Sequence, residues 1–156
     1  RILESRSGDG PWHLLLAGDG AQAEAYRDRG SRELKRVRFL GKVGDIRPLL
    51  RAADLLVHAS LTEGMSNIVL EAMASGLPVV GSMIPGIKEL VEDGRTGVMV
   101  APRDSQALAE ALISLFTTPE RMIDLGTRAR VVVEQRFGLT RMLDAYEELY
   151  DCLTHA

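Results

Sequence analysis

Short apolar runs alternate with amphipathic stretches along the first two thirds of this chain. Each run is continuous, spans four or five residues and is bounded by glycine or proline; the runs are His13–Ala17, Val37–Leu40, Leu55–Ala59, Pro78–Gly81 and Gly97–Val100. Runs of this length are typical of strands buried on both faces, and their alternation with helices is typical of βα units. The pattern therefore predicts an α/β, Rossmann-like fold, with a parallel sheet and helices on both faces.

Helices are predicted between the runs and through the rest of the chain. Those between the runs cover 20–30, 45–53 and 86–91. Beyond Pro102 the apolar residues recur at helical spacing to the end. Asp104 or Ser105 can cap the first of these C-terminal helices. Pro119 can begin the second, and Thr140 can cap the third. With no internal linker, residues 1–156 are expected to form a single domain.

Composition narrows the class of protein. The 156 residues are 46% apolar and 26% charged, which is typical of a soluble globular domain. The net charge of -3 offers no basic footprint for nucleic acid, and no apolar run approaches the roughly 18 residues of a membrane span. A single cysteine, Cys152, excludes an internal disulfide and fits a cytoplasmic setting. Without an initiating Met or a signal peptide, the chain is expected to be an internal piece of a longer protein.

A glycine pattern follows the first run. Gly18-Asp19-Gly20-Ala21-Gln22-Ala23 fits the form G-x-G-x-x-A. A dinucleotide site would also need an acidic residue at the end of the next strand, where Leu40-Gly41-Lys42 stands instead. The glycines are therefore expected to form a tight turn at the carboxyl edge of the sheet, which faces a ligand crevice in open α/β sheets.

Two carboxylates form the most informative motif. Glu63 lies in a polar turn after the third run, and Glu71 lies about two turns further on, in an apolar helix-like segment. The N–H groups and dipole of a helix N-terminus favour an anion there, and Gly64 lets a ligand approach the backbone. Ser66 or Asn67 can cap the helix. On these residues alone an ordinary βα turn is the competing interpretation, although the apolar residues around Glu71 argue against a plain surface position.

This arrangement suits a nucleotide-diphosphate sugar. Helix N–H groups can hold diphosphate oxygens, while one carboxylate accepts hydrogen bonds from the two ribose hydroxyls. A second carboxylate can stabilise positive charge that develops at the anomeric carbon. Such an anionic cluster needs cations, and the nearby Lys42, Arg47 and Lys88 are all expected to be surface charges.

Other chemistry has weaker support. His58 ends the third run, where it either lines the crevice or packs as a hydrogen-bonded core residue. No spacing of His, Asp and Glu suggests a metal site, so no metal is expected. Ser66 has no evident histidine partner in the sequence, and serine hydrolysis is therefore not indicated.

An ordered set of segments resembles a known family. The segments are Leu16–Gly20, Val37–Gly41, Leu49–Leu55, Glu63–Ala74, Gly76–Val80 and Glu89–Gly94 with Thr96-Gly97. From Leu14 to about Tyr150 the chain resembles the C-terminal, donor-binding domain of family 4 (group 1) glycosyltransferases of the GT-B fold. The resemblance implies that a sugar is transferred from a nucleotide-diphosphate donor with retention and without a bound metal. It also suggests a glycan or lipid-linked acceptor, polysaccharide biosynthesis, and a position in the cytoplasm or at the cytoplasmic membrane face.

The resemblance assigns roles to particular residues. Glu63 would act at the donor sugar as the catalytic carboxylate, and Glu71 would hold the ribose. Backbone N–H groups from Met65 to Ile68 would hold sugar and diphosphate oxygens, and residues 41–43 would border the base. The donor-binding set is Glu71, Gly64, Met65, Ser66, Asn67, Ile68, Gly18, Gly41, Lys42 and Val43.

Two departures from the family pattern matter. Many relatives have Phe-Gly after Glu-Gly, where this chain has Met65-Ser66-Asn67, so the identity of the donor stays open. The family's first strand, with its Arg and Lys for the diphosphate, has no counterpart, and neither does the N-terminal acceptor domain. We therefore expect the isolated fragment to be inactive and to bind donor weakly. Without that strand, the fragment could expose inner strand edges, close the gap or pair with another copy.

Two other kinds of function are alternatives to a glycosyltransferase donor domain. A regulatory or interaction α/β domain of the receiver type would need an Asp where the third run ends His58-Ala59-Ser60. A nucleotide-sugar epimerase or a phosphorylase of the GT-B fold would need extra acid/base residues or a cofactor lysine, which the sequence does not show.

Overall fold

A computed structural model describes residues 12–33 and 36–155 of the chain. The chain divides into two compact units, residues 1–49 and 50–156, which are described in turn. The single domain expected over residues 1–156 stays a prediction. The described strands coincide with the five apolar runs, and their parallel pairing confirms the α/β class.

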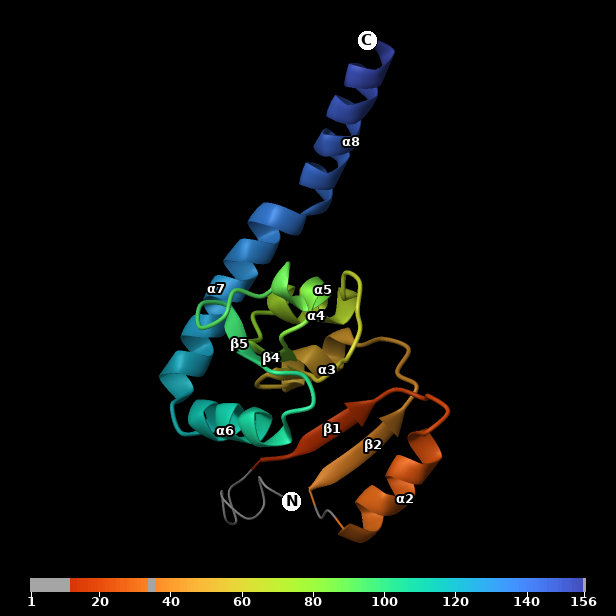
Figure 1. The fold of residues 1–156 in the computed structure, drawn as a ribbon, viewed down its shortest axis with the longest axis vertical. Coiled ribbons are helices and arrows are strands. Elements are labelled where there is room, and N and C mark those ends of the chain that lie inside the picture. The colour runs from red at the N-terminus through yellow and green to blue at the C-terminus, as the bar shows by residue number, and fades with distance from the viewer. Residues whose placement is uncertain (1–11, 34–35, 156) are drawn as a thin grey trace. The chain divides into compact units, whose positions relative to one another are not determined.

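The first unit is built on two parallel strands. β1 (Leu14–Ala17) pairs with β2 (Val37–Gly41), and α2 (Ala23–Glu33) connects them (Figure 1). A Cβ on Gly30 would lie 2.5 Å from the ring of Phe39, so the glycine lets α2 pack closely on β2. The prediction that this helix ends near Gly30 is therefore wrong, because the glycine serves a packing contact inside the helix.

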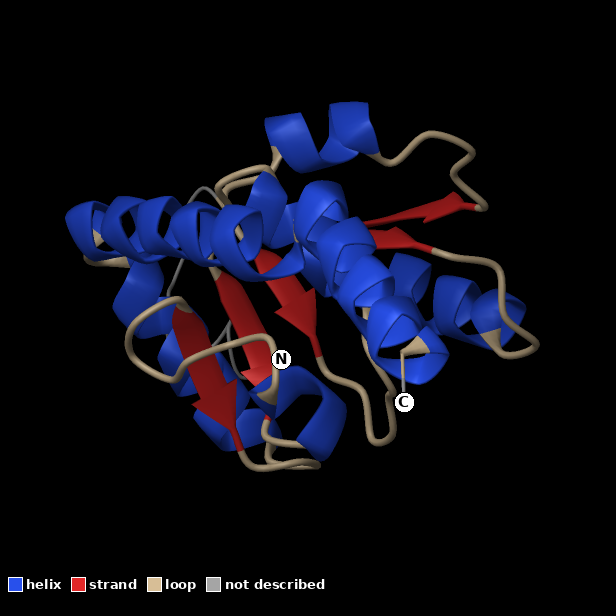
Figure 2. Cartoon of the chain, turned by 90° about the horizontal axis from the view of Figure 1, so that it is seen from above, coloured by secondary structure: helices blue, strands red, loops and turns tan. Residues whose placement is uncertain are grey.

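The second unit holds a sheet in the order β3-β4-β5. Figure 2 shows its strands side by side with helices flanking them. Its strands are β3 (Leu56–His58), β4 (Val79–Ser82) and β5 (Gly97–Val100). Its helices are α4 (Asn67–Ala74), α5 (Pro85–Lys88), α6 (Ser105–Phe116), α7 (Pro119–Phe137) and α8 (Leu139–Thr154). A further helix, α3 (Arg47–Ala52), spans the boundary between the units.

The core of the second unit lies around β4. Every residue of β4 is buried, and the largest buried side chains around it are Val69, Met73, Ile87, Leu90, Leu115 and Leu125. In the first unit Leu15, Leu16 and Leu40 are exposed. Burial on both faces is therefore confirmed for β4 and wrong for β1 and β2, and α2 contacts β2.

Helix α7 packs against α4 at a glycine contact. A Cβ on Gly126 would overlap the carbonyl oxygen of Gly76, which follows α4, so the two backbones touch. Leu125, Ala129 and Val133 are buried along α7, in agreement with the helical spacing of apolar residues predicted beyond Pro102. The predicted start at Pro119 is confirmed too, because proline fits the first turn, where a missing N–H costs nothing.

The ends of α6 and α8 differ in how they are capped. The carboxylate of Asp104 accepts a bond of 2.8 Å from the N–H of Ala107, which confirms one predicted cap. The cap predicted at Thr140 is wrong, because α8 begins at Leu139 after Gly138. Figure 1 shows α8 extending away from the sheet, and none of its residues is buried.

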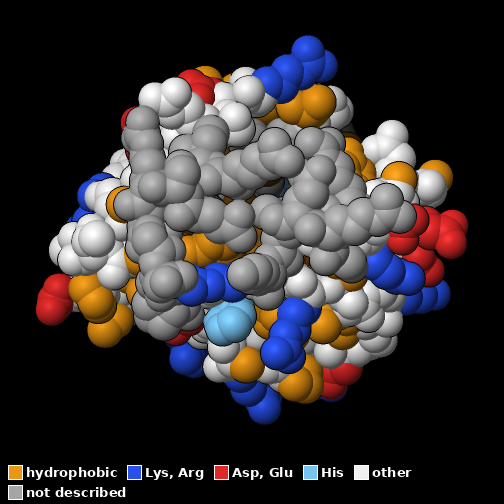
Figure 3. All heavy atoms as spheres, turned by 90° about the horizontal axis from the view of Figure 1, so that it is seen from below, with side chains coloured by type: hydrophobic (Ala, Val, Ile, Leu, Met, Phe, Trp, Pro, Cys, Tyr) orange, Lys and Arg blue, Asp and Glu red, His pale blue; other side chains and the backbone are white. Residues whose placement is uncertain are grey.

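Charge is mixed on the described surface. On the face in Figure 3, Lys and Arg side chains are interspersed with Asp and Glu. Every described helix is too short or too polar to cross a bilayer.

Candidate functional site

The turn that carries Glu63 leads from β3 to α4 and rests on α5. A Cβ on Gly86 would overlap the carbonyl oxygen of Gly64 and would lie 2.5 Å from that of Glu63. Glycine is therefore required at position 86 for the turn to come this close. The contact lies next to the N-cap of α5 at Ile84 and helps to place the turn against the sheet.

Three side chains meet beside this turn. His58 Nε2 lies 3.3 Å from Glu63 Oε1 and 3.4 Å from Ser66 Oγ. The side chain of His58 is 16% exposed and that of Glu63 34%, while Ser66 is buried. The expectation that Ser66 lacks a histidine partner is wrong: the end of β3 and the start of α4 bring together residues eight positions apart.

This cluster does not have the geometry of a serine hydrolase. In a Ser-His-acid triad the serine and the acid bind opposite nitrogens of the imidazole, so that the acid orients the ring. Here Ser66 and Glu63 both approach Nε2 of His58. Ser66 is also only 5% exposed, which keeps its hydroxyl from a substrate.

The position of Ser66 leaves α4 without a side-chain cap. Ser66 has the extended backbone of an N-cap residue, but its side chain makes no capping bond, since its hydroxyl faces His58. The predicted cap by Ser66 is therefore wrong, and Asn67 is the first helical residue. The first N–H groups of a helix have no intrahelical partner, so α4 keeps hydrogen-bond donors next to Glu63.

Glu71 lies in the second turn of α4 and is exposed. The apolar neighbours of Glu71 do not exclude a surface position, contrary to the sequence-based expectation, because consecutive helical residues point to different sides. Ala72 and Met73 face the core, while Glu71 faces solvent. Met65 is 57% exposed and Ile68 is half-buried.

In the first unit, two predicted site residues lie together. The N–H of Gly18 donates a 2.8 Å hydrogen bond to the carbonyl of Gly41, at the carboxyl ends of β1 and β2. Their φ angles of 141° and 66° are in the region that favours glycine, which confirms the tight turn. Lys42 is exposed and Val43 half-buried directly after β2.

The candidate cations are surface groups, as predicted. Arg47 forms bonds of 2.8 and 2.9 Å to the carboxylate of Asp45, and this hydrogen bonding raises the pKa of Arg47. Lys42 and Lys88 are exposed. Among the described residues, no three His, Cys, Asp or Glu side chains gather as a metal site, and metal independence stays a prediction.

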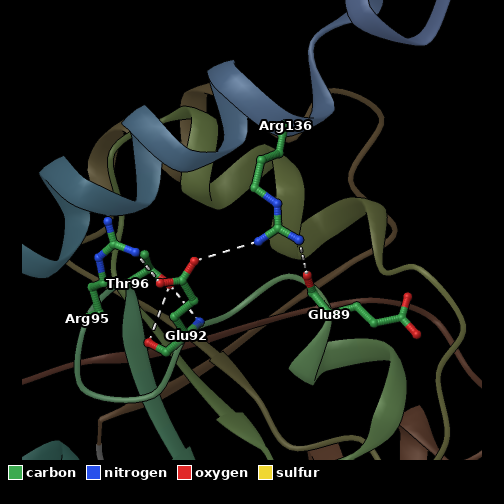
Figure 4. Close-up of polar contacts among 5 residues, drawn as sticks. All are labelled: Glu89, Glu92, Arg95, Thr96 and Arg136. Carbon is green, nitrogen blue, oxygen red and sulfur yellow. Dashed lines mark hydrogen bonds and ion pairs between the residues drawn. The ribbon is translucent and has the colours of Figure 1, made fainter. Parts of the chain in front are cut away.

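Residues of the motif from Glu89 to Gly97 form hydrogen bonds and ion pairs that stabilise the loop before β5. Thr96 is fully buried, and its hydroxyl accepts a 2.9 Å bond from the N–H of Glu92. Arg136, in the last turn of α7, donates to the carbonyl of Glu89 at 3.4 Å and lies 3.6 Å from the Glu92 carboxylate. Figure 4 shows the Glu89 carboxylate pointing away from Arg136. These motif residues therefore support the fold through contacts within the loop and with α7.

Comparison of the sequence with protein families gives a match over residues 1–118 to the family described as "Glycosyl transferases group 1". N-acetyl-alpha-D-glucosaminyl L-malate synthase of Bacillus anthracis is 33% identical over 88% of this chain and 36% of its own length. Glycogen synthase of Mycobacterium tuberculosis is 35% identical over 88% of this chain and 34% of its own. The chain thus spans about a third of the length of these relatives.

Solved structures share the fold. Anabaena HepE in complex with UDP-glucose matches with a TM-score of 0.85 at 28% identity. The match covers 97% of this chain and 44% of the HepE chain. Sucrose-phosphate synthase from Thermosynechococcus elongatus has a TM-score of 0.82 at 29% identity and covers 99% of this chain and 42% of its own. The predicted fold class is confirmed.

Proposed function

This chain belongs to the group 1 glycosyltransferases, and from that premise we propose that it is the donor-binding half of a retaining enzyme. The enzyme would transfer a sugar from a nucleotide-diphosphate sugar to a glycan or lipid-linked acceptor. Anabaena HepE, a structural neighbour, was crystallised with UDP-glucose and with UDP, which supports a donor of this class. Because the chain spans about a third of its relatives, the activity of the whole protein is part of the proposal.

One observation carries the proposal: the uncapped start of α4 stands directly beside Glu63. Ser66 turns its hydroxyl to His58, so the first N–H groups of α4 lack the usual side-chain acceptor. The positive end of a helix dipole and a set of free N–H donors together favour an anion. These features support a diphosphate site at the backbone N–H groups of Met65 to Ile68.

The two carboxylates have separate roles in this proposal. Glu63 is half-buried next to the anion position, where it would accept from sugar hydroxyls and stabilise positive charge at the anomeric carbon. Glu71 is exposed in the second turn of α4, where it would accept from the two ribose hydroxyls. Glu63 therefore acts on the sugar, and Glu71 on the nucleoside.

Several further assignments stay predictions. Gly41, Lys42 and Val43 are expected to border the base, and Gly18 is expected to belong to the donor-binding set. Metal independence, self-association and a cytoplasmic setting are expected from the sequence and the family resemblance. We also expect the 156 residues alone to transfer no sugar and to bind donor weakly, so a micromolar dissociation constant for this piece would contradict that expectation.

The test uses the full-length protein and isothermal titration. A panel of UDP- and GDP-sugars is titrated together with UDP and GDP, and the pair that the protein binds is used further. Glu71→Ala is expected to weaken binding of nucleotide and nucleotide sugar alike, by about tenfold, since both contain the ribose. Glu63→Gln is expected to weaken nucleotide-sugar binding and to leave the nucleotide unaffected.

The matched control is Glu148→Gln, which removes an exposed carboxylate on α8. It is expected to change neither dissociation constant. Unchanged binding in Glu71→Ala would contradict the ribose role. If the full-length protein bound none of the nucleotide sugars, the donor-binding proposal would fail, and a regulatory or interaction domain would be the better description.

A further inference from the structure

His58 supports the carboxylate that the proposed function places at the donor sugar. Its Nε2 atom lies 3.3 Å from Glu63 Oε1 and 3.4 Å from Ser66 Oγ. A ring nitrogen carries either one hydrogen or one lone pair, so the tautomer decides what each neighbour can do. The two neighbours differ in this respect.

Glu63 selects the tautomer. A hydroxyl both donates and accepts, so Ser66 can donate to a lone pair on Nε2 or accept a share of an Nε2 hydrogen. A carboxylate only accepts, and a lone pair on Nε2 would face the Glu63 oxygen with the wrong polarity. The contact therefore favours a hydrogen on Nε2, directed at Glu63. A separation of 3.3 Å is long for a hydrogen bond, and contacts of this kind tighten when a site is occupied.

The backbone of the same turn is held from a second side. Gly86 of α5 touches the carbonyls of Glu63 and Gly64, where a Cβ would overlap. His58 belongs to β3, which pairs with the buried strand β4. The backbone of the turn thus contacts α5, and the side chain of Glu63 contacts His58 of β3.

We infer that His58 is a positioning residue for Glu63 and holds its carboxylate towards the donor sugar through Nε2–H. This inference rests on the proposed function, because it acts through the assigned role of Glu63. It predicts an effect on the sugar and none on the nucleotide. The quantity to measure is the ratio of the dissociation constant for UDP to that for UDP-glucose, or for the GDP pair if the protein binds that one.

Variants of the full-length protein test this ratio. His58→Leu removes the donor and is expected to lower the ratio about tenfold while the UDP constant stays the same. His58→Gln keeps an N–H close to the place of Nε2 and is expected to restore most of the ratio. His155→Gln makes the same change at an exposed position and is the matched control.

The outcomes separate this inference from the function on which it rests. If Glu63→Gln lowers the ratio and His58→Leu does not, the inference is wrong and the role of Glu63 stands. If Glu63→Gln has no effect, both are wrong. Equal loss of UDP and UDP-glucose binding in His58→Leu would indicate a general structural role and would also overturn the inference.

Nitrogen NMR of the wild-type imidazole provides a test that does not depend on the folding of variants. In full-length protein labelled with ¹⁵N at histidine, two-bond correlations identify which ring nitrogen of His58 carries the hydrogen, with the assignment made from the spectrum of His58→Gln. At a pH where the ring is neutral, we expect a hydrogen on Nε2, and a larger share of the Nδ1–H form in Glu63→Gln. An Nδ1–H ring in the wild type would overturn the inference.

Discussion

Gly126 and Gly86 each allow two backbone segments to touch, in two different regions of the second unit. Each lies against backbone carbonyls that a Cβ would meet: Gly126 against Gly76, and Gly86 against Gly64. The contact of Gly126 lies in the core, between α7 and the end of α4, with Leu125 buried beside it. The contact of Gly86 lies under the turn that carries Glu63.

The difference shows how one local requirement serves two purposes. The two helices at Gly126 each bury one face in the core, so neither backbone can give way without opening the core. The turn above Gly86 is bounded by exposed Met65 and by half-buried Glu63, so it can shift into solvent. We therefore expect the first contact to govern stability and the second to govern the site. Four substitutions can break or sharpen this comparison.

The largest effect is expected from Gly126→Val. Its side chain would collide with the carbonyl of Gly76 and separate α7 from α4, which is expected to cost about 3 kcal/mol of unfolding free energy or more. Urea unfolding measures this cost. The control is Thr127→Ala, at an exposed neighbouring position. A Gly126→Val protein as stable as the wild type would contradict the claim that the Gly126 contact governs stability.

Gly86→Ala is expected to cost less stability and more function. The displaced turn relieves part of the overlap, so the expected loss is about 1–3 kcal/mol. Donor binding should fall further than stability alone explains, because Glu63 moves with the turn. Titration at a temperature where the variant is fully folded isolates this effect. Gly44→Ala, where a Cβ would meet nothing within 4 Å, is the control. Normal donor affinity in folded Gly86→Ala would contradict a role in the site.

Gly64→Ala is expected to leave the fold almost unchanged. A Cβ there would meet nothing within 4 Å, and the residue does not need a positive φ, so the change in unfolding free energy should stay within about 0.5 kcal/mol. The proposed donor would approach this backbone closely, and its affinity is expected to fall. Calorimetry on the same preparation measures both quantities. If stability fell and donor affinity did not, Gly64 would have a role in stability, like Gly126, and not in the site.

The smallest effect on stability is expected at α8. Leu149 is exposed on this helix, so Leu149→Ala should change the unfolding free energy by less than about 0.5 kcal/mol. The matched change Leu125→Ala, at a buried position of α7, should lower the unfolding free energy by about 2–5 kcal/mol. A large loss in Leu149→Ala would show that the apolar face of α8 is covered in solution.

Local chemistry made much of the fold predictable. The five strands follow from continuous apolar runs between glycine or proline, the α6 cap from an Asp followed by a helical pattern, and the start of α7 from Pro119. The sheet edge at Gly18 and Gly41 was predictable because positive φ angles favour glycine in any context. The end predicted for α2 near Gly30 was wrong, because in the sequence a glycine needed for packing cannot be distinguished from one that ends a helix.

The chemistry of the candidate site was visible in the sequence, but its side-chain partners were not. Glu63 and Glu71 around a helix start indicated a donor site by residue type and spacing. The contact between Ser66 and His58, the exposure of Glu71 and the support of the turn by Gly86 all depend on segments that meet only after folding. The hydroxyl of a serine suited to capping has two possible hydrogen-bond partners, a backbone N–H of the helix and the side chain of His58, and tertiary packing decides between them.

Sequence alone therefore determined the elements, their parallel order and the kind of chemistry at the start of α4. These features depend on periodicity, on backbone preference and on residue type, which act over a few positions along the chain. Tertiary structure decided which amphipathic helix is buried, which glycine touches a backbone and which donor faces Glu63. Those outcomes depend on what lies opposite each face. Helices α7 and α8 are both amphipathic and follow one another in the chain, yet α7 packs on α4 and the apolar side chains of α8 stay exposed.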